Sequence, residues 1–196
     1  MSLRGVWHFS FTVSNLERSI SFYRDILQLH LIHTQYQDNA YTRRLVGYPN
    51  ARLRVAQFRI PGEPIGPSGH HLELVEYLSP RGSRGDPGIC NPGAAHLAFI
   101  VEDIFSFYDY LIEKKVHFVS PPNLITAGIN KGGYTCYFFD PDEIILELVQ
   151  PRKENVSHGW ASGTEAKGGY SDPVLKRRFK EGRARGDSSS RRRSCG

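Results

Sequence analysis

Two histidines and two glutamates occur in a repeated pattern, and these four residues are the ones best suited to chemistry. The segment 6–13 (VWHFSFTV) is matched by 94–101 (AAHLAFIV), so that His8 and His96 each lie five residues before a valine. The segments 71–75 (HLELV) and 145–149 (ILELV) match in the same way and align Glu73 with Glu147. Two neutral imidazoles and two carboxylates would balance the charge of one divalent cation. Nitrogen and oxygen donors favour Zn, Mn, Fe, Co or Ni.

The alternation of a β-strand predicts that all four side chains point away from the helices. In the first strand His8 shares a face with the small polar side chains of Ser10 and Thr12. The opposite face carries bulky residues that we expect to pack on a helix: Trp7, Phe9, Phe11 and Val13. A single His or Glu in a strand is usually structural. The same pair repeated in both halves has no such explanation, so a shared metal is the better interpretation.

Helical and strand-like patterns follow each histidine segment. Ser14 and Glu17 have the spacing of a capping box before an apolar helical face, and Asp103 is the expected N-cap of the second helix. Strand-like runs are expected at residues 29–36, 41–46, 52–60, 70–78, 118–119, 134–139 and 144–149. The pattern predicts an α+β fold in which tandem βαβββ modules form a curved mixed sheet. Its concave face is the expected pocket.

The predicted boundaries follow from changes in composition. We expect a first module at 5–78, a turn-rich linker at 79–93, a second module at 94–151 and a mostly disordered C-terminal extension at 152–196. The net charge of +5 comes from the segment 173–196, which has nine Lys or Arg against Glu181 and Asp187. The remainder is slightly acidic, so we expect no nucleic-acid partner.

Neither a membrane span nor a signal peptide is indicated, and the expected location is cytoplasmic. The three cysteines, Cys90, Cys136 and Cys195, are far apart and odd in number. We therefore interpret them as reduced thiols.

Four protein ligands in an octahedral shell would leave two positions for a substrate. A carbonyl and a neighbouring oxygen are suitable occupants, with the metal acting as Lewis acid when a carbon-bound proton is removed. Glu73 or Glu147 is the predicted base.

Three motifs resemble the vicinal oxygen chelate superfamily, which includes glyoxalase I, methylmalonyl-CoA epimerase, extradiol dioxygenases and the fosfomycin and bleomycin resistance proteins. They are 22–25 (FYRD), 140–142 (DPD) and 145–148 (ILEL), and the resemblance covers about residues 5–151. The set His8, Glu73, His96 and Glu147 resembles bacterial glyoxalase I, whereas 45–49 (LVGYP) and 128–133 (GINKGG) are closer to the epimerase branch. The resemblance implies a metal-dependent isomerase, epimerase or lyase, similar to methylmalonyl-CoA epimerase or to lactoylglutathione lyase.

The same resemblance leaves two alternatives open. An extradiol ring-cleaving dioxygenase would use His8, His96 and Glu147 on iron, with Tyr137 ten residues before the glutamate. A resistance-type protein would sequester a ligand without catalysis. The chain also departs from the family pattern. The family usually has a glycine after the DPD motif and another at the end of the first helix, whereas this chain has Glu143 and Gln28 at these positions.

The remaining predictions concern substrate and assembly. The expected substrate is a small acidic molecule, with a thioester as one candidate. Arg44 on the expected strand 41–46, His71 beside Glu73, and Lys131 in a glycine-rich loop are the candidate substrate-binding residues. For Arg44 the alternative is a solvated strand edge. The resemblance implies a homodimer, with the metal site formed within one chain or between two.

Overall fold

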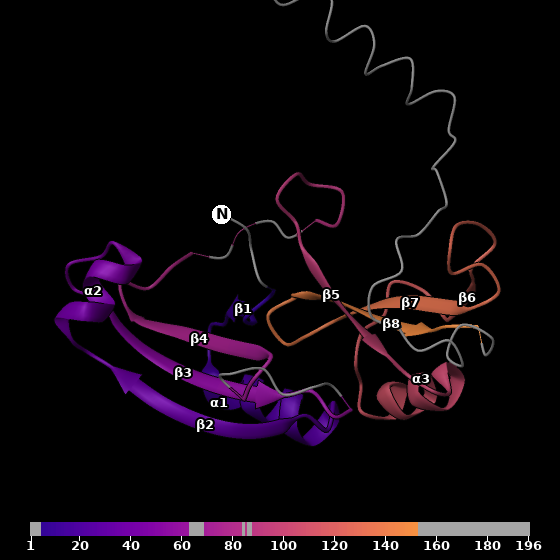
Figure 1. Ribbon diagram of the computed structural model, residues 1–196, viewed down its shortest axis with the longest axis horizontal. Coiled ribbons are helices and arrows are strands. Elements are labelled where there is room, and N and C mark those ends of the chain that lie inside the picture. The colour runs from indigo at the N-terminus through magenta and orange to yellow at the C-terminus, as the bar shows by residue number, and fades with distance from the viewer. Residues whose placement is uncertain (1–4, 63–68, 84, 86–87, 153–196) are drawn as a thin grey trace, which may run out of the picture. The chain divides into compact units, whose positions relative to one another are not determined.

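The computed structural model describes residues 5–62, 69–83, 85 and 88–152, so nearly all of the predicted C-terminal extension lies outside the described residues. The first half contains β1 (Phe9–Thr12), α1 (Leu16–Ser21), η1 (Phe22–Ile26), β2 (His30–Gln37), α2 (Ala40–Val46), β3 (Arg52–Arg59) and β4 (Leu72–Ser79). Its sheet has the order β1-β4-β3-β2 (Figure 1), with β1 parallel to β4 and the other pairs antiparallel.

The second half repeats this arrangement. It contains β5 (His96–Ile100), α3 (Ile104–Glu113), β6 (Asn123–Leu124), β7 (Tyr134–Phe139) and β8 (Ile145–Gln150). The strand order β5-β8-β7-β6 matches that of the first sheet, again with one parallel pair, β5 and β8. The predicted α+β fold of two βαβββ halves is therefore confirmed.

The expected strand at 41–46 is wrong, because these residues form helix α2. The Asn39 side chain accepts a hydrogen bond from the Thr42 N–H and caps the start of the helix. Gly47 ends it in the left-handed conformation, with a φ of 77°. Two capping signals thus outweigh a strand-like apolar pattern.

The start of α1 also differs from the prediction. Asn15, not Ser14, is the N-cap, and its side chain accepts a hydrogen bond from the Arg18 N–H. Asp103 caps α3 as expected. The expected strand at 118–119 is reduced to an isolated bridge between Phe118 and Phe138, while the two-residue strand β6 was not predicted.

Buried side chains from both halves form one hydrophobic cluster. The largest fully buried members are Tyr23, Phe58 and Phe138, with leucines of β4 and β8 around them. Of the bulky residues in and beside β1, Phe11 and Val13 reach this cluster, whereas Trp7 and Phe9 stay 56% and 49% exposed. The expectation that the whole bulky face of this segment packs on a helix is therefore wrong for its first half.

Two carboxylates in the turn between β7 and β8 accept hydrogen bonds from Ser14, from α1 and from η1. We call this set of contacts the clasp. Asp142 accepts hydrogen bonds from the Ser14 N–H at 2.9 Å, the Ser14 hydroxyl at 2.6 Å and Arg18 Nη2 at 2.5 Å. Asp140, which is buried, accepts from the Tyr23 hydroxyl at 3.2 Å. The clasp therefore joins the two halves by polar contacts.

Two turns keep a glycine-like backbone without glycine. Gln28 has a φ of 59° and Glu143 a φ of 63°, which is the conformation that the usual glycine of each turn would adopt. Both turns are thus retained despite the substitutions. In the part of the chain that the structure describes, no helix has the length and apolarity needed to span a membrane.

Candidate metal centre

The two histidine–glutamate pairs lie in the same register in both sheets. Because β1 runs parallel to β4, Ser10 pairs with Glu73, and Ala98 on β5 pairs with Glu147 on β8. Each glutamate therefore stands opposite the residue two positions after its histidine. In β4 and β8 the flanking leucines are buried in the core while the glutamate is not, so both glutamates point away from the core, as the alternation predicts.

The first pair is His8 and Glu73, and a third residue joins it. His8 Nε2 lies 3.9 Å from Glu73 Oε1, and Gln57 Nε2 donates to Glu73 Oε2 at 3.2 Å. The His70 ring stacks on the His8 ring, with centroids 4.9 Å apart. His8, His70 and Glu73 each offer a donor atom within 4.8 Å of the other two, which makes them a potential metal-binding group.

The second pair is His96 and Glu147. His96 Nε2 lies 3.2 Å from Glu147 Oε2, and the Thr135 hydroxyl donates to Glu147 Oε1 at 2.5 Å. The His96 side chain is 44% exposed, and the Tyr137 ring meets it edge-on with centroids 5.2 Å apart. The His96 side of this pair is therefore open to solvent.

The structure brings the predicted ligands together as two pairs, not as one set of four. Among the described residues, the group with converging donors is His8, His70 and Glu73, and His96 and Glu147 are not part of it. We call the two pairs, His8 with Glu73 and His96 with Glu147, the candidate half-sites.

His70 was not among the residues predicted from the sequence. Strand alternation would place it on the face opposite Glu73, but β4 begins only at Leu72, so the alternation does not extend to position 70. The signal that could have found it is the pair of adjacent histidines, His70 and His71, that precedes the strand.

The candidate substrate-binding residues lie in varied settings. Arg44 is exposed on α2, where the expected strand is absent, and its neighbour Arg43 pairs with Asp38. His71 Nδ1 accepts a hydrogen bond from the Ile60 N–H at 3.4 Å. Lys131 is exposed in the turn before β7.

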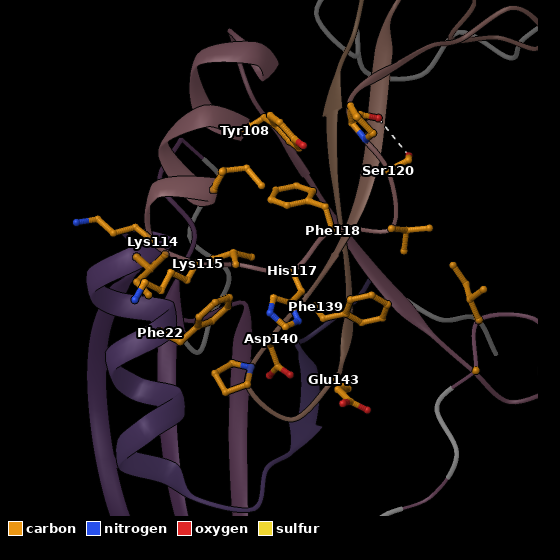
Figure 2. Close-up of a pocket in the computed structure, with 18 residues that line it drawn as sticks. Phe22, Tyr108, Lys114, Lys115, His117, Phe118, Ser120, Phe139, Asp140 and Glu143 are labelled. Atoms are coloured by element: carbon orange, nitrogen blue, oxygen red, sulfur yellow. Dashed lines mark hydrogen bonds between the residues drawn. The ribbon is translucent and has the colours of Figure 1, made fainter.

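A hollow of about 1180 Å³ lies elsewhere, beside α3 and the turn that follows β7 (Figure 2). Aromatic side chains such as Phe22, Tyr108 and Phe118 line it, and Lys114 and Lys115 lie along one side. Since neither half-site contributes to its lining, this hollow is distinct from the candidate metal centre.

Two groups beside Glu147 have raised pKa values. Burial and the nearby Glu147 raise the pKa of the Tyr137 hydroxyl, so it stays protonated and can donate a hydrogen bond at neutral pH. The same two causes raise the pKa of the Cys136 thiol to about 11. Cys136 is buried in the core beside its β8 partner Leu148, so the metal donors on the open face are imidazole nitrogen and carboxylate oxygen. This donor set fits a divalent transition metal.

Comparison with known proteins identifies the family. The family model described as "Glyoxalase/Bleomycin resistance protein/Dioxygenase superfamily" matches residues 5–148. A 2-epi-5-epi-valiolone epimerase from an Actinomyces species is 32% identical over 148 residues, which are 74% of this chain and 78% of that protein.

Solved structures agree in fold. A glyoxalase family protein from Bacillus cereus has a TM-score of 0.62 at 21% identity, and the match covers 77% of this chain and 96% of that protein. A glyoxylase/bleomycin resistance protein/dioxygenase domain from Frankia sp. has a TM-score of 0.55 at 24% identity, and the match covers 77% of this chain and 100% of that domain. The resemblance drawn from the sequence motifs is thereby confirmed, and the chain belongs to the glyoxalase/bleomycin resistance protein/dioxygenase superfamily.

Proposed function

We propose that this protein is a divalent-metal-dependent epimerase that removes and returns a proton next to a carbonyl group. The observation that carries the proposal is the repeated His–Glu pair, found at the same register in both sheets. The 32% identical relative supports it, because that protein is named as an epimerase and its substrate, by name, is a ketone.

The ligands that we propose for the metal are His8, Glu73, His96 and Glu147. Bound there, a divalent ion would polarise the substrate carbonyl and stabilise the negative charge that forms when the neighbouring proton leaves. The histidine of each half-site lies on or next to an edge strand, since β1 and β5 end their sheet orders, whereas the glutamates lie on the neighbouring inner strands β4 and β8. Trp7 and Phe9 are exposed on and next to β1, and an exposed apolar edge favours pairing with another strand. We propose that the half-sites meet in this way in a homodimer.

The two carboxylates supply the proton transfers in this proposal. Glu73 and Glu147 come from different halves, so they approach a bound substrate from different directions. One removes the proton from one face of the carbon and the other returns it on the opposite face. Gln57 and Thr135, which hydrogen-bond these carboxylates, hold each in position. The Tyr137 hydroxyl donates to a substrate oxygen.

The proposed substrate is a small hydroxylated or acidic ketone. Arg44, His71 and Lys131 remain our candidates for contacting its outer groups. Two related reactions would begin with the same proton removal: epimerisation of a thioester, as in methylmalonyl-CoA epimerase, and a reaction like that of lactoylglutathione lyase. One assay can therefore test these two reactions together with epimerisation of a ketone.

The experiment measures metal content and proton exchange together. Purified protein is loaded with Mn, Co, Ni or Zn and incubated in deuterium oxide with candidate ketones and thioesters, and deuterium at the carbon beside the carbonyl is followed by NMR. We expect exchange that requires metal and that falls at least about a hundredfold in Glu73→Gln and Glu147→Gln. Glu113→Gln, at the end of α3, is the matched control.

Three results would contradict the proposal. Oxygen consumption with catechols on the iron-loaded protein would favour the dioxygenase, whereas ligand binding without metal would favour a resistance-type protein. Metal binding without exchange on any substrate would also count against it.

Mixing two inactive variants tests the homodimer. If the site forms between subunits, His8→Ala and His96→Ala proteins should regain activity when they are unfolded and refolded together, because some mixed dimers hold one complete site. A site within one chain would give no recovery, which would overturn this part of the proposal.

A further inference from the structure

We propose that His70 is a positioning residue for the metal centre: it fixes the orientation of His8 and the ring nitrogen through which His8 binds the metal. This inference rests on the proposed function for the metal itself, but the contact between the two rings can be tested without metal. The family resemblance implies no role for this position.

The contacts of His8 divide its two ring nitrogens between two partners. Its Nδ1 lies 3.1 Å from His70 Nε2, which is hydrogen-bond distance. Its Nε2 lies on the side of Glu73, 3.9 Å from Oε1. A metal held jointly by His8 and Glu73 therefore takes the Nε2 side, and the Nδ1 side belongs to His70.

A neutral imidazole carries one N–H and one lone pair, so the two sides are linked. The nitrogen that binds a metal must offer its lone pair, which places the hydrogen of His8 on Nδ1. His70 Nε2 is then the acceptor of that hydrogen bond. Histidine ligands commonly need such a partner for their second nitrogen, because it fixes both the tautomer and the ring orientation.

The setting of His70 makes it a rigid partner. The residue is 3% exposed, and its ring stacks on that of His8 with an angle of 29° between the planes. Glu73 Oε2 lies 4.0 Å from the same Nε2, so the carboxylate also borders this contact. A buried ring in contact with its neighbour limits the rotation of His8.

The duplicated fold does not itself require a histidine here. His70 lies three residues before Glu73, and the residue three before Glu147 is the partly buried Ile144. An apolar side chain therefore serves at the equivalent point of the second half. His96 meets the edge of Tyr137 instead of a second imidazole, and its side chain is more exposed than that of His8.

The test compares His70→Gln with His70→Leu in the full-length protein. Glutamine places an oxygen acceptor within reach of His8 Nδ1, whereas leucine fills the space without one. His117→Leu, which changes an exposed histidine of the second half, is the matched control. Circular dichroism of the metal-free proteins shows whether each variant is folded.

The first readout is the His8 tautomer in the metal-free protein, obtained from long-range ¹H–¹⁵N NMR. We expect the hydrogen on Nδ1 in the parent protein and in His70→Gln, and a mixture of tautomers in a folded His70→Leu. The second readout is the affinity for Zn²⁺, measured by chelator competition. We expect it to fall about 10- to 100-fold in His70→Leu, and by less than about threefold in His70→Gln and His117→Leu.

Distinct results overturn the inference and the proposed function. A parent His8 with its hydrogen on Nε2, or a folded His70→Leu with unchanged Zn²⁺ affinity, would overturn the positioning role. Equal loss of affinity in both His70 variants, with an altered Co²⁺ absorption spectrum in each, would make His70 a direct ligand instead. A parent protein that binds no metal would overturn the proposed function, while the tautomer measurement would still decide the contact.

Discussion

Removing the Asp142 carboxylate should destabilise the protein, because it is the centre of the clasp between the halves. Asp142→Ala deletes three hydrogen bonds, from the Ser14 N–H, the Ser14 hydroxyl and Arg18 Nη2. Charge-assisted bonds reach about 1.5–3 kcal/mol each when buried. The Arg18 side chain is 47% exposed and the Ser14 donors can turn to water, so we expect about 2–3 kcal/mol for all three together.

Asp142→Asn tests the charge of this side chain separately from its shape. The asparagine keeps an acceptor for Ser14 but loses the ion pair with Arg18, so we expect the free energy of unfolding to fall by about 1 kcal/mol. The pH dependence of stability supplies a second measurement. Burial raises the pKa of Asp142, but hydrogen bonds from Ser14 and Arg18 outweigh it and hold that pKa below its ordinary 3.8. A lowered folded-state pKa adds stability at pH values above the ordinary 3.8. That stability should be lost as the pH falls through the lower folded-state pKa.

Urea denaturation followed by circular dichroism, at pH 7 and near pH 3, measures these free energies of unfolding. Asp109→Asn, an exposed carboxylate on α3, is the control and should change stability by less than about 0.5 kcal/mol. A double-mutant cycle with Arg18→Ala isolates the ion pair. A cost below about 0.5 kcal/mol for Asp142→Ala, or no coupling in the cycle, would refute the reasoning.

Three further predictions concern single sites away from the clasp. Gly133→Ala places a methyl carbon 2.5 Å from the Gln150 carbonyl oxygen, so we expect a loss of about 1–3 kcal/mol and a lower midpoint of thermal unfolding. Gln28→Gly relieves a φ of 59°, and after the entropy cost of glycine it should raise the free energy of unfolding by up to about 1 kcal/mol in urea titration. Cys136, buried and with a pKa of about 11, should resist iodoacetamide at pH 8 while exposed Cys90 reacts, and peptide mass spectrometry distinguishes the two.

The sequence was most informative where a residue pattern repeats. Alternation in β4 and β8 correctly predicted that Glu73 and Glu147 oppose the buried leucines, because a strand in a covered sheet cannot reverse its faces. The match between the histidine segments likewise predicted a strand in each of them, and β1 and β5 lie there. Duplication provided two independent copies of the same evidence.

Elements set by single capping contacts were harder to predict. Residues 41–46 have a strand-like pattern, and one side-chain cap at Asn39 with one left-handed glycine at Gly47 makes them a helix. His70 was missed for a related reason, since the alternation used to assign faces starts only at Leu72. The sequence does not determine how the proposed half-sites would meet, because edge strands can pair within a chain or between copies.

The two half-sites are alike in register and unlike in surroundings, and this difference matters for the proposed reaction. Glu73 is held by an amide and lies beside two histidines, whereas Glu147 is held by a hydroxyl and lies beside His96 and Tyr137. Two identical half-sites would offer both faces of a substrate the same carboxylate. In the proposed reaction, different neighbours would let the two glutamates hold the proton with different strength, so that one is ready as base while the other is ready as acid. Duplication would thus supply the proposed metal ligands, and divergence around them would distinguish the two carboxylates.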